Sequence, residues 1–181
     1  MIEVEITEDI VEEAKKYNQY VRGASESTWG NKVSVSETGW LVGRIGTLVV
    51  ANYYDVPLTS IDKTDFVVGG PDTFYRPSYD MLVDGYKIVV KTKTRNVPPL
   101  PHYEASVPGQ SIDMIDADYY IFVSLYKQEK AYIMGTMKTD EFLEKSTAYK
   151  KGDIDLSNNF KVRINCHNIA YEKLHDLGVL V

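Results

Sequence analysis

A carboxylate and a lysine can be placed side by side from the sequence alone. Asp84-Gly85 separates two runs with β-strand character, and this dipeptide is the strongest short signal of a two-residue hairpin turn. Such a turn fixes the register, so that Asp80 faces Val89 and lies diagonally close to Lys91. Carboxylate oxygens are ligands that hard Mg²⁺ prefers, and a lysine beside them offsets negative charge. The hairpin is therefore the first candidate for a chemical site.

The two faces of this hairpin differ in character. Because side chains alternate along a strand, one face carries only apolar or aromatic residues and is predicted to be core: Met81, Val83, Tyr86, Ile88 and Val90. The other face carries the candidate site: Asp80, Leu82, Lys87, Val89, Lys91 and Lys93. Val89 is apolar among mostly charged neighbours on that second face.

The phrase Ile88-Val89-Val90-Lys91-Thr92-Lys93-Thr94-Arg95, preceded by Asp80, resembles the core of PD-(D/E)xK nucleases of the small phage type. The resemblance covers roughly residues 40 to 150, and the hairpin is its most specific part. It implies a restriction-endonuclease-like α/β fold, with a central mixed β-sheet flanked by helices. It also implies a DNA endonuclease that uses Mg²⁺ or Mn²⁺ to hydrolyse phosphodiester bonds, a reaction in which the cation neutralises developing charge and activates water.

The resemblance assigns a role to each matching residue. Asp80 would bind the metal, Lys91 would assist the attacking water, and Lys93 and Arg95 would contact phosphate. A literal Pro-Asp pair also occurs at Pro71-Asp72, but the hairpin register favours Asp80 as the first acid of the motif.

Two positions depart from the pattern of similar nucleases. The acid expected in the triplet is Val89, and the helical Glu expected after Gly43-Arg44-Ile45-Gly46 is Thr47. The substitute acid that we predict for catalysis and metal binding is Glu104, on the next predicted strand. Asp72 and Asp84 are further alternatives, although Asp84 is already explained by the turn.

These departures leave three readings open. The first is the metal-dependent endonuclease. The second is a catalytically silent protein of the same fold, natural or disabled by substitution, that binds nucleic acid or a protein partner. The third is an unrelated small α/β interaction domain, in which Asp80 merely opens a strand and the lysines form a solvated face.

The elements that must position these residues follow from hydrophobic periodicity and turn signals. Helices are predicted over 6–21, 39–54 and 140–150, with a loop over 22–38. Strands are predicted over 66–68, 79–83, 86–94, 104–107, 119–126, 131–137 and 160–164. Gly43 and Gly46 inside the second helix suggest the close approach of another backbone.

Composition narrows the class of protein. The 181 residues fit a single domain spanning 1–181. One cysteine, Cys166, and three scattered histidines do not favour a disulfide or a zinc site. The net charge of −6 is mild evidence against nonspecific DNA binding. Without a signal peptide or a membrane-length apolar run, a cytoplasmic location is predicted, in the host cytoplasm if a phage encodes the chain. A homodimer is also open, since cutting two strands favours one.

Overall fold

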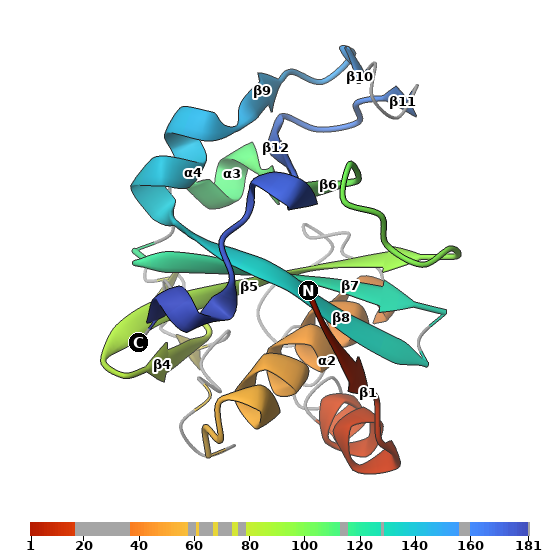
Figure 1. Cartoon of the computed structure of the whole chain (residues 1–181), viewed down its shortest axis with the longest axis vertical. Helices are drawn as coiled ribbons and strands as arrows, with labels where there is room; N and C mark the ends of the chain where they lie inside the picture. Colours follow the sequence, from red (N-terminus) through yellow and green to blue (C-terminus); the bar gives the residue numbers. More distant parts are fainter. Residues whose placement is uncertain are drawn as a thin grey trace.

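A five-stranded mixed β-sheet forms the centre of the fold (Figure 1). The computed structural model describes residues 1–16, 37–57, 61, 67–68, 74–75, 79–112, 116–127, 129–155 and 160–180. The strand order is β1-β8-β7-β5-β4, with bounds Ile2–Glu5 for β1, Lys130–Lys138 for β8, Tyr119–Tyr126 for β7, Tyr86–Arg95 for β5 and Met81–Val83 for β4. β5 and β7 run parallel, and the other neighbours are antiparallel. The predicted mixed α/β class with a central mixed sheet is confirmed.

The hairpin between β4 and β5 has the predicted register. Its pairs are Met81 with Ile88, Leu82 with Lys87 and Val83 with Tyr86. Asp84 and Gly85 have φ angles of 49° and 85°, the left-handed conformation that a tight two-residue hairpin turn requires at both positions. The turn chemistry of this dipeptide therefore sets which residues of the two strands face one another.

Helix α2, Glu37–Tyr53, covers one face of the sheet and packs mainly against β5. The predicted helix over 39–54 agrees within two residues at each end. A Cβ atom on Gly46 would lie 1.9 Å from Thr92 Oγ1 of β5, whereas one on Gly43 would meet nothing within 4 Å. A close approach is thus found at Gly46, although to the Thr92 side chain and not to a backbone as predicted, and the prediction is wrong at Gly43.

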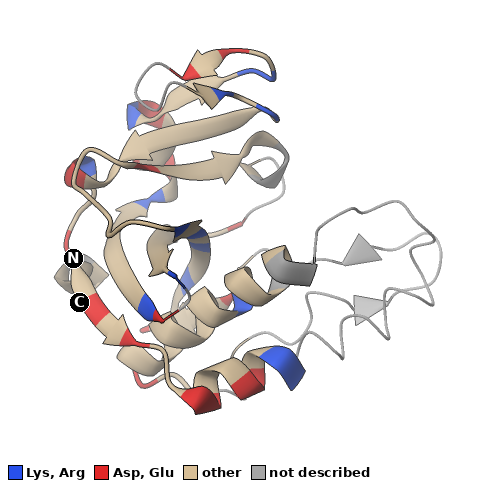
Figure 2. Ribbon diagram, turned by 90° about the vertical axis from the view of Figure 1, so that its right-hand side faces the viewer, with Lys and Arg blue, Asp and Glu red and all other residues tan. Residues whose placement is uncertain are grey.

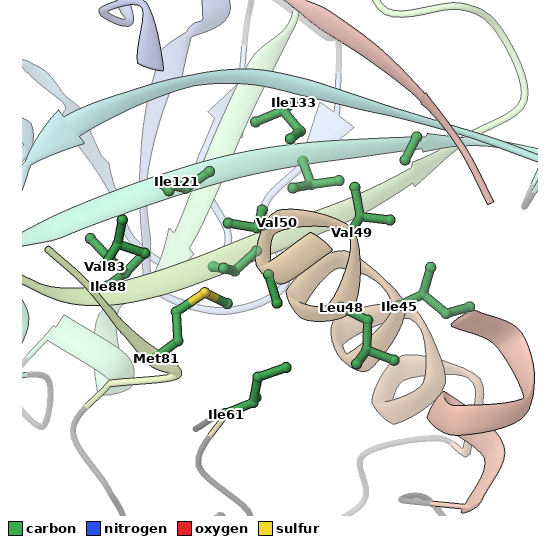
Figure 3. Close-up of a cluster of buried hydrophobic side chains, with 14 of the residues drawn as sticks. Ile45, Leu48, Val49, Val50, Ile61, Met81, Val83, Ile88, Ile121 and Ile133 are labelled. Atoms are coloured by element: carbon green, nitrogen blue, oxygen red, sulfur yellow. The ribbon is translucent and has the colours of Figure 1, made fainter. Parts of the chain in front are cut away.

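A first apolar cluster fills the space between α2 and the sheet (Figure 3). It joins side chains of α2 to the predicted core face of the hairpin, including Val49, Met81, Ile88 and Val90. Tyr86, which was predicted to belong to this core, is 43% exposed. It lies at the turn end of β5, where its ring packs edge-on against Tyr119 at 5.3 Å, so it borders the core instead of filling it.

A second layer covers the opposite face of the sheet, as the side view in Figure 2 also shows. It contains a three-stranded antiparallel sheet in the order β6-β12-β9, formed by Glu104–Pro108, Cys166–Ala170 and Thr147–Tyr149. Helices α3, Gly109–Ile112, and α4, Thr139–Lys145, accompany it. Its apolar residues include Val107, Phe142 and Ile169, and they pack with side chains of the central sheet. Both faces of the sheet are therefore buried.

Several predicted boundaries differ from the structure. The helix predicted over 140–150 ends at Lys145, because the residues after it form β9 and pair with β12. The strand predicted over 160–164 is reduced to β11, Phe160–Lys161, which pairs with β10, Ile154–Asp155. The longer strand in this region is β12, which was not predicted.

The remaining elements are short. Residues 8–16 of the helix predicted over 6–21 are helical, and most of the loop predicted over 22–38 lies outside the described residues. β2, Val67–Val68, pairs with β3, Phe74–Tyr75, and two 3₁₀ helices, η1 at Tyr171–Lys173 and η2 at Leu177–Leu180, follow β12. Among the described helices, none has the length and apolar character needed to cross a bilayer.

Candidate functional site

The Asp80 carboxylate is fixed against the return strand of the hairpin. Strand pairing ends at Met81 and Ile88, and the Asp80 amide nitrogen donates to the Ile88 carbonyl at 2.7 Å. Its Oδ2 atom accepts a hydrogen bond from the Val90 amide at 2.6 Å. Asp80 thus contacts the residues on either side of Val89. The predicted pair of Asp80 with Val89 is not formed, because the regular strand pairing stops one residue earlier.

Lys91 follows this anchoring point directly. It lies in β5 opposite Phe122 of β7 and is half-buried. Because strand side chains alternate, Lys91 shares its face with Val89, the face that the second layer covers. The Asp80 carboxylate is thus hydrogen-bonded to the residue that precedes Lys91, and the convergence of the two side chains stays a prediction.

Val89 occupies an apolar environment. It is 5% exposed and belongs to the second apolar cluster, together with Ala105, Tyr120 and Phe122. Its isopropyl group is therefore a normal core side chain. From the sequence Val89 was an apolar exception on a polar face, but in the structure that part of the face is buried and apolar. A carboxylate at this position would be desolvated, which favours its neutral form unless a cation or hydrogen bonds compensate.

Thr47 is occupied within its own helix. It is buried, and its hydroxyl donates to the Gly43 carbonyl one turn earlier at 3.2 Å. Helix α2 covers the sheet face opposite to that of Val89. The two positions that depart from the nuclease pattern thus have structural roles in different parts of the fold.

Glu104 belongs to a buried polar cluster in the second layer. Its Oε2 atom accepts from Asn168 Nδ2 at 3.1 Å, and the same Nδ2 atom donates to Asp155 Oδ2 at 3.4 Å. Asp155 and Asn168 are only 3% and 5% exposed. These contacts link Glu104 to β10 and β12, whereas Asp80 is linked to Val90 of β5. They do not themselves bring the two predicted metal ligands together.

Lys93 reaches the same cluster from β5. Its Nζ atom donates to the Glu104 carbonyl and to Ser106 Oγ, both at 3.4 Å. Burial lowers the Lys93 pKa, and the neighbouring Arg95 lowers it further, while Glu104 and Asp155 act in the opposite direction. A contact of Lys93 with phosphate stays a prediction.

Arg95 connects the end of β5 to the second layer. Its Nη2 atom donates to the Glu104 carbonyl at 3.0 Å and to the Tyr171 hydroxyl at 3.5 Å. The guanidinium also lies over the rings of Tyr103 and Tyr171, at 4.6 and 5.5 Å from their centroids. These contacts give Arg95 a structural role, and its predicted contact with phosphate stays a prediction.

Sequence reasoning missed Asp155 and Asn168. Neither lies in a motif, and Asn168 reaches Glu104 only because β12 pairs with β6 across a long stretch of chain. The one local signal was the run Cys166–Ala170, whose strand character was not recognised. Asp72, the alternative first acid, lies outside the described residues.

The hairpin offers few ligands to a metal ion. In the parts of the chain that the structure describes, His, Cys, Asp and Glu side chains form no group of three or more that could hold one. Asp80 supplies a carboxylate, while Val89 supplies carbon where the nuclease pattern has a second acid. This donor set does not fit a firmly held Mg²⁺, an ion that gives up its water ligands reluctantly.

Comparison of the chain with protein-family models, with curated proteins and with solved structures found no match. The resemblance of the hairpin to the PD-(D/E)xK core therefore depends on the residues themselves.

Proposed function

We propose that this protein binds DNA through a nuclease-like core whose hydrolytic site is impaired. The observation that carries the proposal is the hydrogen bond from the Val90 amide to the Asp80 carboxylate. It holds Asp80, the proposed first acid, against the residue that precedes Lys91. Val89, at the proposed position of the second acid, is part of the apolar core.

The order of elements supports a restriction-endonuclease-like architecture. A helix, α2, precedes the hairpin that carries Asp80 and packs on β5, and β5 then pairs in parallel with β7. In this proposal Lys91 contacts a phosphate of the DNA backbone. Lys93 and Arg95 contribute from the same strand, chiefly by holding the second layer in place beside it.

Impaired hydrolysis follows from the chemistry. Phosphodiester cleavage by this class of site uses a divalent cation to neutralise charge and to lower the pKa of the attacking water. One carboxylate competes poorly with water for Mg²⁺ or Mn²⁺. Replacing Val89 by Glu would place a second carboxylate next to Asp80 and Lys91 and would complete the motif.

The second candidate is an endonuclease that is active as it stands. The presence of Asp80 and Lys91 favours it, because a carboxylate and a lysine are two of the groups that this hydrolysis uses. Glu104 is the predicted substitute acid, and its hydrogen bond with Asn168 would have to break before its carboxylate could join Asp80. Glu104→Gln tests this requirement.

The experiment combines binding and cleavage. Single- and double-stranded DNA are incubated with Mg²⁺ and with Mn²⁺, and binding is measured in parallel by fluorescence anisotropy. The variants are Lys91→Ala and Val89→Glu, with Val107→Glu as the matched control, because Val107 is a buried valine of the same apolar cluster. Size-exclusion chromatography reports whether the protein is a dimer.

The proposal expects DNA binding that Lys91→Ala weakens, no cleavage by the unmodified protein, and cleavage by Val89→Glu but not by Val107→Glu. Cleavage by the unmodified protein that both Lys91→Ala and Glu104→Gln abolish would support the active endonuclease instead. If no variant binds or cleaves DNA, the nuclease-like reading is wrong, and a role in binding a protein partner becomes the better explanation.

A further inference from the structure

A basic hollow lies on the second layer. Its volume is about 690 Å³, within the range of roughly 300–1,000 Å³ typical of small-molecule sites. The described part of its lining comes from α3, from β9 and the residues that follow it, and from β12 and the residues that lead into it. It includes Tyr149, Lys150, Lys151, Arg163, Ile164 and Asn165.

Asn165 holds two walls of the hollow together. Its side-chain Oδ1 accepts from the Lys151 amide at 2.9 Å, and its carbonyl accepts from the Gly109 amide at 2.8 Å. A Cβ atom on Gly109 would approach Asn165 to 3.3 Å, so the two segments are in close contact. The walls are therefore connected by hydrogen bonds and are not merely adjacent.

The charge of the hollow opposes that of the whole chain. Three exposed cations, Lys150, Lys151 and Arg163, line it, and its described lining contains no Asp or Glu. The Asp153 carboxylate, which is close in sequence, accepts a hydrogen bond from the Lys150 amide at 2.7 Å. In a chain of net charge −6, cations gathered in a concave surface raise the local concentration of anions.

Flat apolar surface accompanies these cations. The Arg163 guanidinium lies 5.6 Å from the ring centroid of Phe160, an exposed aromatic residue outside the lining of the hollow. The lining residue Ile164 is also exposed. Aromatic rings and arginine planes are surfaces on which nucleobases stack, independently of base identity. Burial raises the pKa of the Cys166 thiol, and the nearby Asp155 and Glu104 carboxylates raise it further, which disfavours the reactive thiolate form.

We propose that this hollow binds a phosphate-bearing nucleotide unit, supplied either by single-stranded nucleic acid or by a free nucleotide. Lys150, Lys151 and Arg163 contact the phosphate, and the surface around Phe160 and Ile164 receives the base. The site is separate from the hairpin site at Asp80 and Lys91, and it does not depend on the function proposed for that site.

The test uses two probes and a charge-matched control. A fluorescein-labelled single-stranded oligothymidylate is titrated with the protein, and thymidine 5′-monophosphate is added as a competitor. The test variant is Lys150→Ala/Arg163→Ala. The control is Lys15→Ala/Lys16→Ala, which removes two exposed lysines from the helical residues 8–16, at the opposite end of Figure 1 from β9.

The proposal expects the test variant to bind the oligothymidylate about tenfold more weakly or worse, because it loses two phosphate contacts. Affinity falls as salt rises, and a plot of log affinity against log salt should become less steep by about 1.4, at roughly 0.7 for each lost phosphate contact with a single strand. The control should stay within about twofold of the unmodified protein, because screened charges distant from the site contribute little. If thymidine 5′-monophosphate displaces the oligothymidylate, the hollow accepts a free nucleotide. If it does not, the ligand is the single-stranded polymer.

Three results would overturn the proposal: no binding by the unmodified protein, unchanged binding by the test variant, or an equal loss in the control. Lys91→Ala is measured in the same assay to separate the two sites. If only Lys91→Ala weakens binding of the oligothymidylate, the result supports the hairpin site and contradicts the hollow. If only Lys150→Ala/Arg163→Ala weakens binding, the result supports the hollow. Circular dichroism and thermal unfolding verify that each variant is folded.

Discussion

Gly46 and Gly43 provide a paired test of how closely α2 approaches the sheet. Both lie inside the same helix, and each is replaced by Ala. In Gly46→Ala, the new methyl group would lie 1.9 Å from Thr92 Oγ1 and 2.9 Å from Thr92 Cβ and Cγ2. In Gly43→Ala, the new methyl group would have no neighbour within 4 Å. The two variants thus share their chemistry and differ in the space available.

The magnitude follows from two opposing effects. Replacing Gly by Ala in a helix stabilises it by about 1 kcal/mol, and Gly43→Ala should show most of this gain. Overpacking a core costs about 1–3 kcal/mol. Gly46→Ala belongs at the upper end of that range, because its contact falls about 1.5 Å short of the 3.4 Å at which ordinary contact begins. We expect a net loss of about 2 kcal/mol for Gly46→Ala, and a difference of about 3 kcal/mol between the variants.

The assay is urea unfolding followed by circular dichroism, with the free energy of unfolding extrapolated to water. The double variant Gly46→Ala/Thr92→Ala removes Oγ1 and Cγ2 and should recover part of the loss. Equal stabilisation by Gly43→Ala and Gly46→Ala would refute the reasoning, since it would mean that α2 and β5 are not in contact at this point.

Three further predictions concern the second layer. Burial lowers the Lys93 pKa in the folded protein below the ordinary lysine value of 10.5, so just below that pH the unfolded chain binds more protons and stability rises with pH. Lys93→Met should remove this rise, which unfolding at a series of pH values measures. Arg95→Lys should destabilise by about 1–2 kcal/mol through loss of stacking on Tyr103 and Tyr171, and an unchanged unfolding midpoint would contradict this. Asn168→Asp should lower the free energy of unfolding by at least about 2 kcal/mol at neutral pH. The Asn168 side chain donates to the carboxylates of Glu104 and Asp155, and the substitution would put a third carboxylate next to these two. Acidification should reduce that cost, and a loss independent of pH would argue against charge repulsion.

The parts of the fold that the sequence predicts well are those decided locally. The register of the hairpin follows from two residues, Asp84 and Gly85, whose positive φ angles constrain both strands. β7 was predicted with its observed bounds, because a continuous aromatic and β-branched run ended by polar residues is a strand signal that does not depend on distant contacts.

The parts that were missed depend on pairing between distant segments. The predicted helix beyond Lys145 failed because Thr147–Tyr149 gains more from pairing with β12 than from continuing a helix. Val89 was read as an exception on a polar face because the strands that bury it could not be placed from periodicity. The contact of Glu104 with Asn168 has the same origin, so the candidate site was predicted only as far as the hairpin extends.

The pairing of β1 with β8 has a consequence for how the chain acquires its structure. Lys130 and Glu3 form an ion pair at 2.6 Å although 127 positions separate them, and β1 aligns with β8 from Ile2 to Glu5. During synthesis β1 leaves the ribosome before the other strands of this sheet, and its pairing partner emerges only after α2, the hairpin and β7. Closing so long a loop is entropically costly and slows folding. We therefore expect the outer edge of β8 to be covered late in folding, when β1 pairs with it.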